Sequence, residues 1–262
     1  MRKLFTILGL LAMLLPLSSK VWGMDDETLH YNVHYKWGFI DADAGVATLT
    51  TEVDSAGGTF TSTLTGRSVN LLGHVYTAGD TISGQIMTDT FQPVYTQRIS
   101  QEAGEFSIET ITYDTSASST AGEIVKRLPG GEVVRSRVSH YGGGLTLDLL
   151  AVFYYMRQLD YEKMNPGDKT TINVFAGTTP ETLTAVYDGR RQWTIGDTTY
   201  PVYAVSLSFS LDHDGRQVTD TLDVLIDASD SRIPLYIDGQ LKVGHMICRY
   251  IPDAEAVHGV VD

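Results

Sequence analysis

The chain has 262 residues, of which 42% are hydrophobic and 19% charged, and its formal net charge at pH 7 is −13. This hydrophobic content is ordinary for a globular protein and excludes wholesale disorder. The excess of acidic residues argues against a nucleic-acid-binding protein and against docking on anionic lipid, because both need basic patches.

The N-terminal segment has the organisation of a secretory signal peptide. Arg2-Lys3 forms a short basic start, an apolar run follows over residues 4–17, and Gly23 offers a small residue at the cleavage position. The apolar run is shorter than the roughly 20 residues that span a bilayer. We therefore expect residues 1–23 to be cleaved and the mature protein to be periplasmic or extracellular, with no integral membrane segment.

Short runs that alternate apolar and polar residues recur along the rest of the chain and predict β-strands. The predicted strands cover residues 30–36, 46–53, 59–65, 94–100, 106–113, 123–128, 133–138, 170–175, 182–187, 191–195, 200–210, 217–226, 233–237 and 245–250. Asp188-Gly189, Gly196-Asp197 and Asp238-Gly239 are expected to be hairpin turns between strands. Such short connections predict antiparallel neighbours.

Residues 146–161 break the strand period and predict a helix. Leu149, Leu150 and Phe153 belong to an apolar set that covers most of its circumference, which is typical of a buried helix. Asp148 suits the positive end of the helix dipole. Residues 69–76 are a second, weaker candidate for helical or irregular structure.

The predicted fold is mainly β: a curved antiparallel sheet, or an open barrel or β-sandwich, with one central buried helix that packs against or plugs the sheet. Residues 24–262 are expected to form a single domain. The alternative is two β halves, 24–141 and 170–262, joined by the helix at 146–161.

The sequence predicts no metal site and no cofactor. His30 and His34 lie on one strand face, but four strand residues span about 13 Å, too far for a shared metal ion. Asp212-His213-Asp214-Gly215 resembles the start of a calcium loop but lacks the later oxygen ligands, so we expect a hairpin turn there. Cys248 is the only cysteine and is expected to be a buried, inert thiol.

No catalytic residue is predicted either. Asp223 and Asp227 share a strand face and Asp230 follows, and a glycosidase does need two carboxylates about 5–10 Å apart. With 32 acidic residues, however, such pairs arise by chance. The side chains of Ser139 and His140 would point to opposite faces of a strand, so they do not suggest a catalytic triad.

Aromatic residues are the main candidates for ligand contact, although they also fill ordinary cores. The candidates are Tyr31, Tyr35, Trp37, Phe39, Tyr154, Tyr155, Trp193, Tyr200 and Tyr203. They would line a cavity for a lipid or a glycan, but no binding residue is assigned.

Four segments, 31–49, 80–95, 148–168 and 230–244, resemble in order the bacterial exported family known as domain of unknown function 3108. The resemblance implies an exported protein with a β-rich fold, and it brings no assigned activity and no catalytic residues. Residues 227–229 depart from the more aromatic strand end of the family. Within the last segment, the proline of Arg232-Ile233-Pro234 indicates a strand start or edge.

Three functions stay open. The first is a non-enzymatic cell-envelope protein that binds an apolar, lipid-like ligand or a glycan, and a deep apolar cavity would favour it. The second is a secreted hydrolase that acts on glycans through a carboxylate pair, which two close carboxylates in an open cleft would favour. The third is a structural or assembly partner without a small ligand, which a large apolar surface patch would favour.

Overall fold

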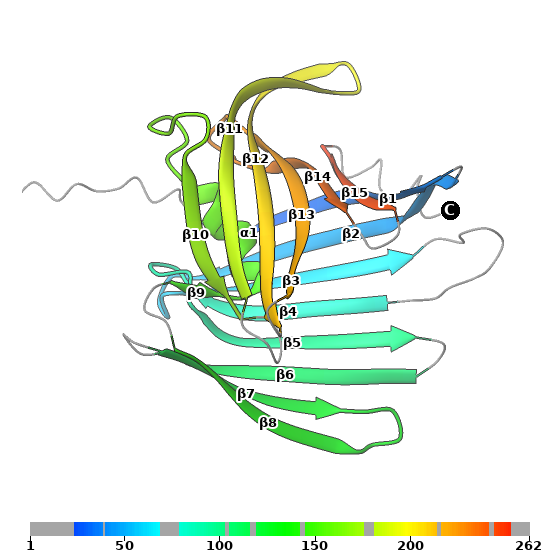
Figure 1. Cartoon of the computed structure of the whole chain (residues 1–262). Helices are drawn as coiled ribbons and strands as arrows, with labels where there is room; N and C mark the ends of the chain where they lie inside the picture. The colour runs from blue at the N-terminus through cyan, green and yellow to red at the C-terminus, as the bar shows by residue number, and fades with distance from the viewer. Residues whose placement is uncertain are drawn as a thin grey trace, which may run out of the picture.

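The computed structural model describes residues 24–38, 40–68, 79–102, 105–115, 119–141, 145–175, 181–213, 216–240 and 244–252. These residues form one 15-stranded sheet and one helix (Figure 1). In chain order the elements are β1 (Glu27–Trp37), β2 (Ile40–Asp54), β3 (Thr59–Ser68), β4 (Gly79–Met87), β5 (Pro93–Glu102), β6 (Glu105–Thr115), β7 (Ser119–Arg127), β8 (Val133–Tyr141), β9 (Thr146–Leu147), α1 (Leu149–Gln158), β10 (Lys169–Val174), β11 (Glu181–Ile195), β12 (Thr198–His213), β13 (Arg216–Asp227), β14 (Pro234–Gln240) and β15 (His245–Ile251).

The sheet consists of two meanders that meet at its centre. Strands β8 to β1 follow one another from one edge, and β15 to β9 continue to the other edge. The meanders join where β1 pairs antiparallel with β15, which places Val33 opposite Cys248. The two expected β halves thus share one continuous sheet. Strands β2–β8 cross β11–β13 in the view of Figure 1, so the sheet twists strongly along its length.

The expected architecture, a curved and mainly antiparallel sheet with a central helix, is confirmed. The helix is shorter than the predicted span of 146–161. Thr146 and Leu147 form strand β9, which pairs parallel with Asn173 and Val174 of β10, and Leu159 has an extended backbone. Pairing with a distant strand thus overrides the local helical pattern at the N-terminal end of α1.

Local contacts fix both ends of α1. The side chain of Asp148, only 1% exposed, accepts a hydrogen bond from the backbone N–H of Ala151 at 2.7 Å and caps the helix. Arg157 lies in the last turn, where the helix dipole favours a cation. The hydroxyl of Tyr161 donates to the carbonyl of Met156 at 2.7 Å, which satisfies one of the last carbonyls of the helix.

Tyr154 anchors α1 on the inner face of the sheet. Its hydroxyl lies 2.6 Å from the hydroxyl of Thr51 in β2 and 2.8 Å from that of Ser62 in β3. Its ring meets Phe60 edge-on with centroids 4.8 Å apart. Tyr154 is 1% exposed. By contrast, two residues that we expected to be buried are not: Phe153 is only half-buried, and Leu149, at the start of the helix, is 50% exposed. The face of the helix that carries Tyr154 therefore packs against β2 and β3.

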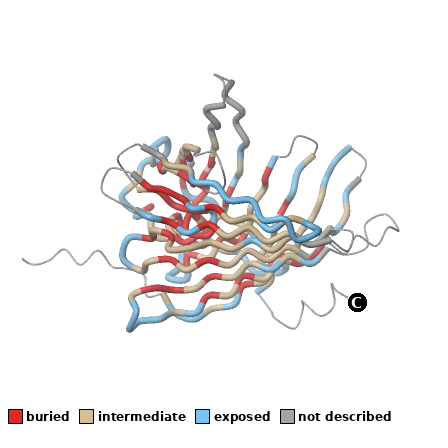
Figure 2. The backbone as a smooth tube through the Cα atoms, turned by 90° about the horizontal axis from the view of Figure 1, so that it is seen from below, coloured by how far each residue is buried: buried red, intermediate tan, exposed pale blue. Residues whose placement is uncertain are grey.

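A second, smaller cluster ties together strands near the two edges of the sheet. Phe175, which follows β10, packs edge-on against Tyr113 of β6 with ring centroids 5.7 Å apart. The hydroxyl of Tyr113 donates to the carbonyl of Phe175 at 2.9 Å. Gly122 of β7 makes this contact possible, because an added Cβ would lie 2.2 Å from the ring of Phe175. Buried segments gather in the interior, whereas turns and strand ends are exposed (Figure 2).

Two predicted hairpin turns are wrong and one is confirmed. At Asp188-Gly189 the chain does not turn: β11 continues through a bulge between Tyr187 and Gly189, where the glycine has φ +107°. At Asp238-Gly239 strand β14 continues to Gln240. Gly196-Asp197 does connect β11 to β12, and Ile195 pairs with Thr198.

Some predictions fall outside the described residues: those for 1–23, for 69–76, and for Phe39, Asp214 and Gly215. Strands β12 and β13 nevertheless pair with each other up to His213 and Arg216, the two residues that flank Asp214-Gly215. Over the described part of the chain, no helix is both long and apolar enough to cross a membrane.

Candidate functional site: an outer groove

Two adjoining depressions lie on the outer side of the sheet. Ile237 of β14 packs on the core around α1, so strand alternation directs its neighbours Tyr236 and Asp238 to the opposite, outer face. Both of these residues line a depression of about 340 Å³ over β11–β14 and another of about 590 Å³ that reaches β15 and the end of β1. We call the two depressions together the outer groove.

An aromatic pair forms one wall of the groove. The rings of Trp193 from β11 and Tyr236 from β14 lie 4.8 Å apart between centroids, at 49° to each other. Strands β12 and β13 lie between the two parent strands, so the rings lean toward each other across the sheet. Both side chains are half-buried. Burial raises the pKa of Tyr236, and the carboxylate of Asp238 adds to the effect.

Three carboxylates border this aromatic pair. The hydroxyl of Ser206 lies 2.6 Å from Asp188 Oδ2 and 3.1 Å from Asp223 Oδ1, and it has one proton to donate. Asp223 stands opposite Asp238 in the β13–β14 ladder. Asp238 accepts a hydrogen bond from the hydroxyl of Tyr236 at 3.2 Å. These three carboxylates therefore offer oxygens that can accept hydrogen bonds from further donors.

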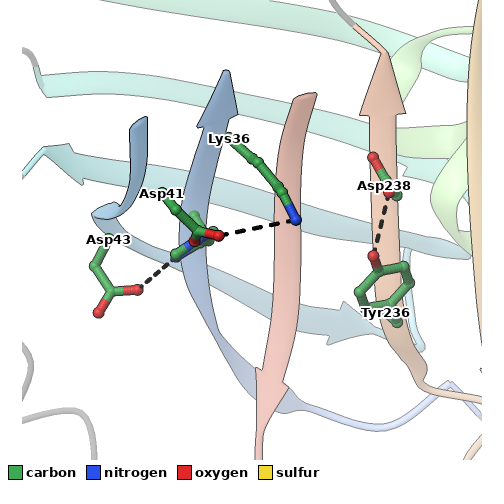
Figure 3. Close-up of polar contacts among 6 residues, drawn as sticks. Lys36, Asp41, Asp43, Tyr236 and Asp238 are labelled. Carbon is green, nitrogen blue, oxygen red and sulfur yellow. Dashed lines mark hydrogen bonds and ion pairs between the residues drawn. The ribbon is translucent and has the colours of Figure 1, made fainter. Parts of the chain in front are cut away.

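The other end of the groove carries basic and aromatic residues. Lys36, Trp37, His245 and Arg249 line the larger depression. His245 Nδ1 lies 3.0 Å from Asp238 Oδ1. Figure 3 shows Lys36 beside the carboxylates of β2 on one side, and Tyr236 with Asp238 on the other.

Beside this end, His34 is held between two carboxylates of β2. Its Nδ1 lies 3.0 Å from Asp43 Oδ1, and its Nε2 contacts Asp41. The hydrogen bond from His34 is the main cause that lowers the pKa of Asp41, and Lys36, whose Nζ lies 3.8 Å from Asp41 Oδ2, acts in the same direction. These contacts order the rim of the groove.

The structure does not bring the two strand histidines together. His30 Nδ1 lies 3.0 Å from the hydroxyl of Thr48, whereas His34 binds Asp41 and Asp43. Among the described residues, no group of three or more His, Cys, Asp and Glu side chains is placed to hold a metal ion.

The aspartates singled out in the sequence have separate roles. Asp223 lines the groove. Asp227 is buried and accepts hydrogen bonds from Ser229 and Ser231, so it orders the loop before β14. Asp230 is exposed beside a different cavity. The sequence thus missed Asp188 and Asp238, which join Asp223 only through strand register.

Of the eight aromatic candidates that the structure describes, three are buried in the core and two line the groove. Tyr31, Tyr154 and Tyr203 are buried, and Trp37 and Trp193 line the groove. Sequence reasoning missed Tyr236, although its alternation with Asp238 was a usable signal. Cys248 is half-buried, and burial raises the pKa of its thiol to about 11, which favours the unreactive protonated form.

Two smaller cavities lie at the ends of α1. One of about 190 Å³ is lined by Tyr154, Arg157 and Arg232, and another of about 60 Å³ is lined by Tyr113 and Asp148. Ligand pockets commonly measure about 300–1,000 Å³. Neither of these two cavities has the volume expected for a lipid-like ligand, whereas both depressions of the outer groove fall in that range.

The charged residues beside these cavities support the fold. Arg157 Nη2 lies 3.1 Å from Glu27 Oε2 and donates to the carbonyl of Ser231 at 2.9 Å. Arg232 is 4% exposed, and its guanidinium carbon lies 4.5 Å from the centre of the Tyr203 ring. Burial raises the pKa of Asp148, while its hydrogen bond with Thr96 acts in the opposite direction.

Comparison with known proteins agrees with this architecture. The structure is similar to the crystal structure of a beta-barrel-like protein of domain of unknown function DUF1849 from Brucella abortus, with a TM-score of 0.59. The two sequences are 10% identical, and the match covers 87% of this chain and 96% of that chain, which shows a shared fold. No curated protein matches the sequence. The model of the family described as "Protein of unknown function (DUF3108)" matches residues 30–248, and the chain therefore belongs to this family.

Proposed function

We propose that this protein is an exported cell-envelope protein that binds a glycan in the outer groove. The observation that carries the proposal is the pair of Trp193 and Tyr236 bordered by the carboxylates of Asp188, Asp223 and Asp238. A sugar ring has an apolar C–H face, which packs on aromatic rings, and hydroxyl groups around its edge, which donate hydrogen bonds to carboxylates. Both kinds of partner stand side by side here.

An apolar ligand is less well supported. The cavities next to α1 hold about 60 and 190 Å³, and charged groups line both. The larger depressions lie outside and have carboxylates, basic side chains and aromatic rings in their walls. This mixture suits a hydroxyl-rich ligand better than a hydrocarbon chain.

The hydrolase alternative has one observation in its favour. Asp188 and Asp223 both lie within hydrogen-bond distance of Ser206, so their nearest oxygens are close together. A glycosidase also needs a carboxyl group kept protonated near neutral pH. Within the described residues, burial raises the pKa of Asp148, which caps α1 in the interior and lies outside the groove. Binding without hydrolysis is therefore the proposal.

Replacing Trp193 by alanine should weaken glycan binding about 2- to 13-fold, because aromatic contacts are worth roughly 0.5–1.5 kcal/mol. Isothermal titration calorimetry with β-linked glucose and N-acetylglucosamine oligosaccharides would measure the loss. Asp223→Asn should also weaken binding, because an amide oxygen accepts less strongly than a carboxylate.

The matched control is Asp114→Asn, because Asp114 is a 78% exposed carboxylate on β6, away from the groove. It should leave the affinity unchanged. Equal affinities for the wild-type protein and Trp193→Ala, or no binding of any oligosaccharide by the wild-type protein, would refute the proposal. Release of new reducing ends during incubation would instead establish the hydrolase.

Export is the second part of the proposal and rests on residues 1–23 of the sequence. The chain isolated from the envelope of an expressing bacterium should begin at Met24. Edman sequencing or intact-mass measurement would show this directly. A protein that retained residues 1–23, or that fractionated with the cytoplasm, would contradict export.

A further inference from the structure

The two edges of the sheet differ in length. At one edge, β9 has only two residues, and α1 begins after Asp148. At the other edge, β8 has nine residues and, among the described residues, pairs only with β7. Figure 1 shows β8 as the outermost strand on this side. Half of its backbone N–H and C=O groups therefore point away from the described part of the sheet, in the direction in which a further strand would pair.

Strand β8 is fixed in its extended form. All nine residues pair with β7 in one continuous register, from Val133 opposite Arg127 to Tyr141 opposite Ser119. Val138 packs against the smaller core cluster around Phe175. The strand contains no proline, which would remove a hydrogen-bond donor from the ladder. An edge that is already ordered loses little conformational freedom when another strand binds to it.

The two faces of β8 carry different side chains. Ser136 stands opposite Ile124 of β7, which is buried, so Val134, Ser136 and Val138 lie on the inner face. From Val134 to Val138 this inner row is uncharged. Arg135 and Arg137 lie on the outer face, and β8 contains no acidic residue although the net charge of the chain is −13.

Both kinds of side chain are accessible at this edge. Val133 and Val134 are 41% and 44% exposed, and Arg135 is exposed as well. The side chain of Arg137 is 58% exposed, although its Nη2 lies 3.5 Å from Asp114 Oδ2. A strand that paired with the backbone of β8 would therefore also cover apolar side chains and meet two guanidinium groups.

The two arginines decide which kind of strand fits. Like charges that stand directly opposite each other in a sheet are destabilising, and opposite charges are stabilising. A second copy that paired antiparallel along the whole of β8 would put the two Arg137 side chains opposite each other, because Arg137 is the middle residue of the strand. A strand with acidic residues at alternate positions would instead place carboxylates beside both arginines. Its intervening residues would meet the uncharged inner row.

We infer that β8 binds an extended acidic segment of another protein, which adds to the sheet as a further strand. The segment carries carboxylate side chains on the outer face and apolar or small side chains on the inner face. Backbone hydrogen bonds supply affinity in this mode of recognition, and the alternating side chains supply specificity. A single added strand forms a small interface, so the complex is transient. This inference is independent of glycan binding, which is proposed for another part of the sheet.

A peptide of the length of β8 that alternates glutamate and valine provides the test. It should bind the chain from Met24 onward in fluorescence anisotropy, and it should slow the hydrogen exchange of backbone amides in residues 133–141. The same peptide with lysine in place of glutamate should bind at least about 5-fold more weakly, because the cross-strand charge pairs change sign. A glutamate–valine peptide that is N-methylated at its central residues keeps its charges, loses the donors of the ladder, and should not bind.

Charge variants of β8 complete the test. The double change Arg135→Gln and Arg137→Gln should remove the preference for the glutamate peptide, and Arg135→Glu with Arg137→Glu should reverse it. Arg98→Glu on β5 is the matched control, because its side chain is 55% exposed and lies away from this edge. It should leave the preference unchanged.

Three results would overturn the inference: equal binding of the glutamate and lysine peptides, undiminished binding of the N-methylated peptide, or slowed exchange only outside residues 133–141. Slower exchange of the β8 amides with rising protein concentration, in the absence of peptide, would overturn it as well. A second copy of the chain would then be the partner of this edge.

Discussion

Replacing Tyr154 by alanine should lower the free energy of unfolding by at least about 3–5 kcal/mol, the usual cost of emptying a buried aromatic site. Tyr154 is 1% exposed, and its hydroxyl serves both Thr51 and Ser62, which are themselves buried. Two buried hydroxyls that lose their partner add to the cavity term. Urea denaturation of the variant and the wild-type protein would measure the difference.

Three further variants separate the contribution of the Tyr154 hydroxyl to stability from that of its ring and from those of two nearby residues. Tyr154→Phe keeps the ring and should cost about 1–3 kcal/mol for the hydrogen bonds alone. Phe153→Ala should cost less than Tyr154→Ala, because Phe153 is only half-buried. Lys163→Ala, at a residue whose side chain is 83% exposed, should change stability by less than about 0.5 kcal/mol. Similar small losses in all four variants would contradict the central position of α1.

The second large loss is expected for Phe175→Ala, again about 3–5 kcal/mol, because Phe175 is fully buried against Tyr113 and Gly122. Gly122→Ala should cost about 1–3 kcal/mol for the opposite reason, since its Cβ would collide with the Phe175 ring. The loss in the double variant should be smaller than the sum of the two, because the new methyl group then enters the space left by the ring.

Gly66→Ala is the matched control, because nothing lies within 4 Å of a Cβ at this strand glycine. It should leave stability within about 0.5 kcal/mol of the wild-type value. Additive losses at Gly122 and Phe175 in urea denaturation would show that the strands near the two edges of the sheet do not meet as described.

The strand pattern in the sequence was enough to predict the fold class, but not where each strand ends. Local signals favoured turns at Asp188-Gly189 and Asp238-Gly239, yet both pairs lie inside strands. At Asp188-Gly189 the ladder with β12 continues past a bulge, and at Asp238-Gly239 the pairing with β13 and β15 holds the strand extended. Such pairing depends on partners far along the chain, which a local pattern does not contain.

The candidate site shows the same limit more clearly. Sequence alternation correctly put Asp223 and Trp193 in strands, and it gave no means of pairing Asp223 with Asp238 or Trp193 with Tyr236. Those neighbours follow from the register of β11–β14, and a shift of one residue would turn every one of these side chains to the other face. A site made from one or two residues of each of four strands leaves no contiguous motif in the sequence.

The pairing of β1 with β15 has a consequence for the order of folding. All other antiparallel neighbours in the sheet are close in sequence, whereas this pair joins the two ends of the described chain. Contacts between distant residues form late, because the closure of a long loop costs conformational entropy. During synthesis, β1 keeps an unpaired edge until the last strand emerges, and such edges invite association with other chains. A chain that ended before His245 would therefore lack β15 and leave β1 and β14, which lie near the centre of the sheet, as unpaired edges prone to association with other chains.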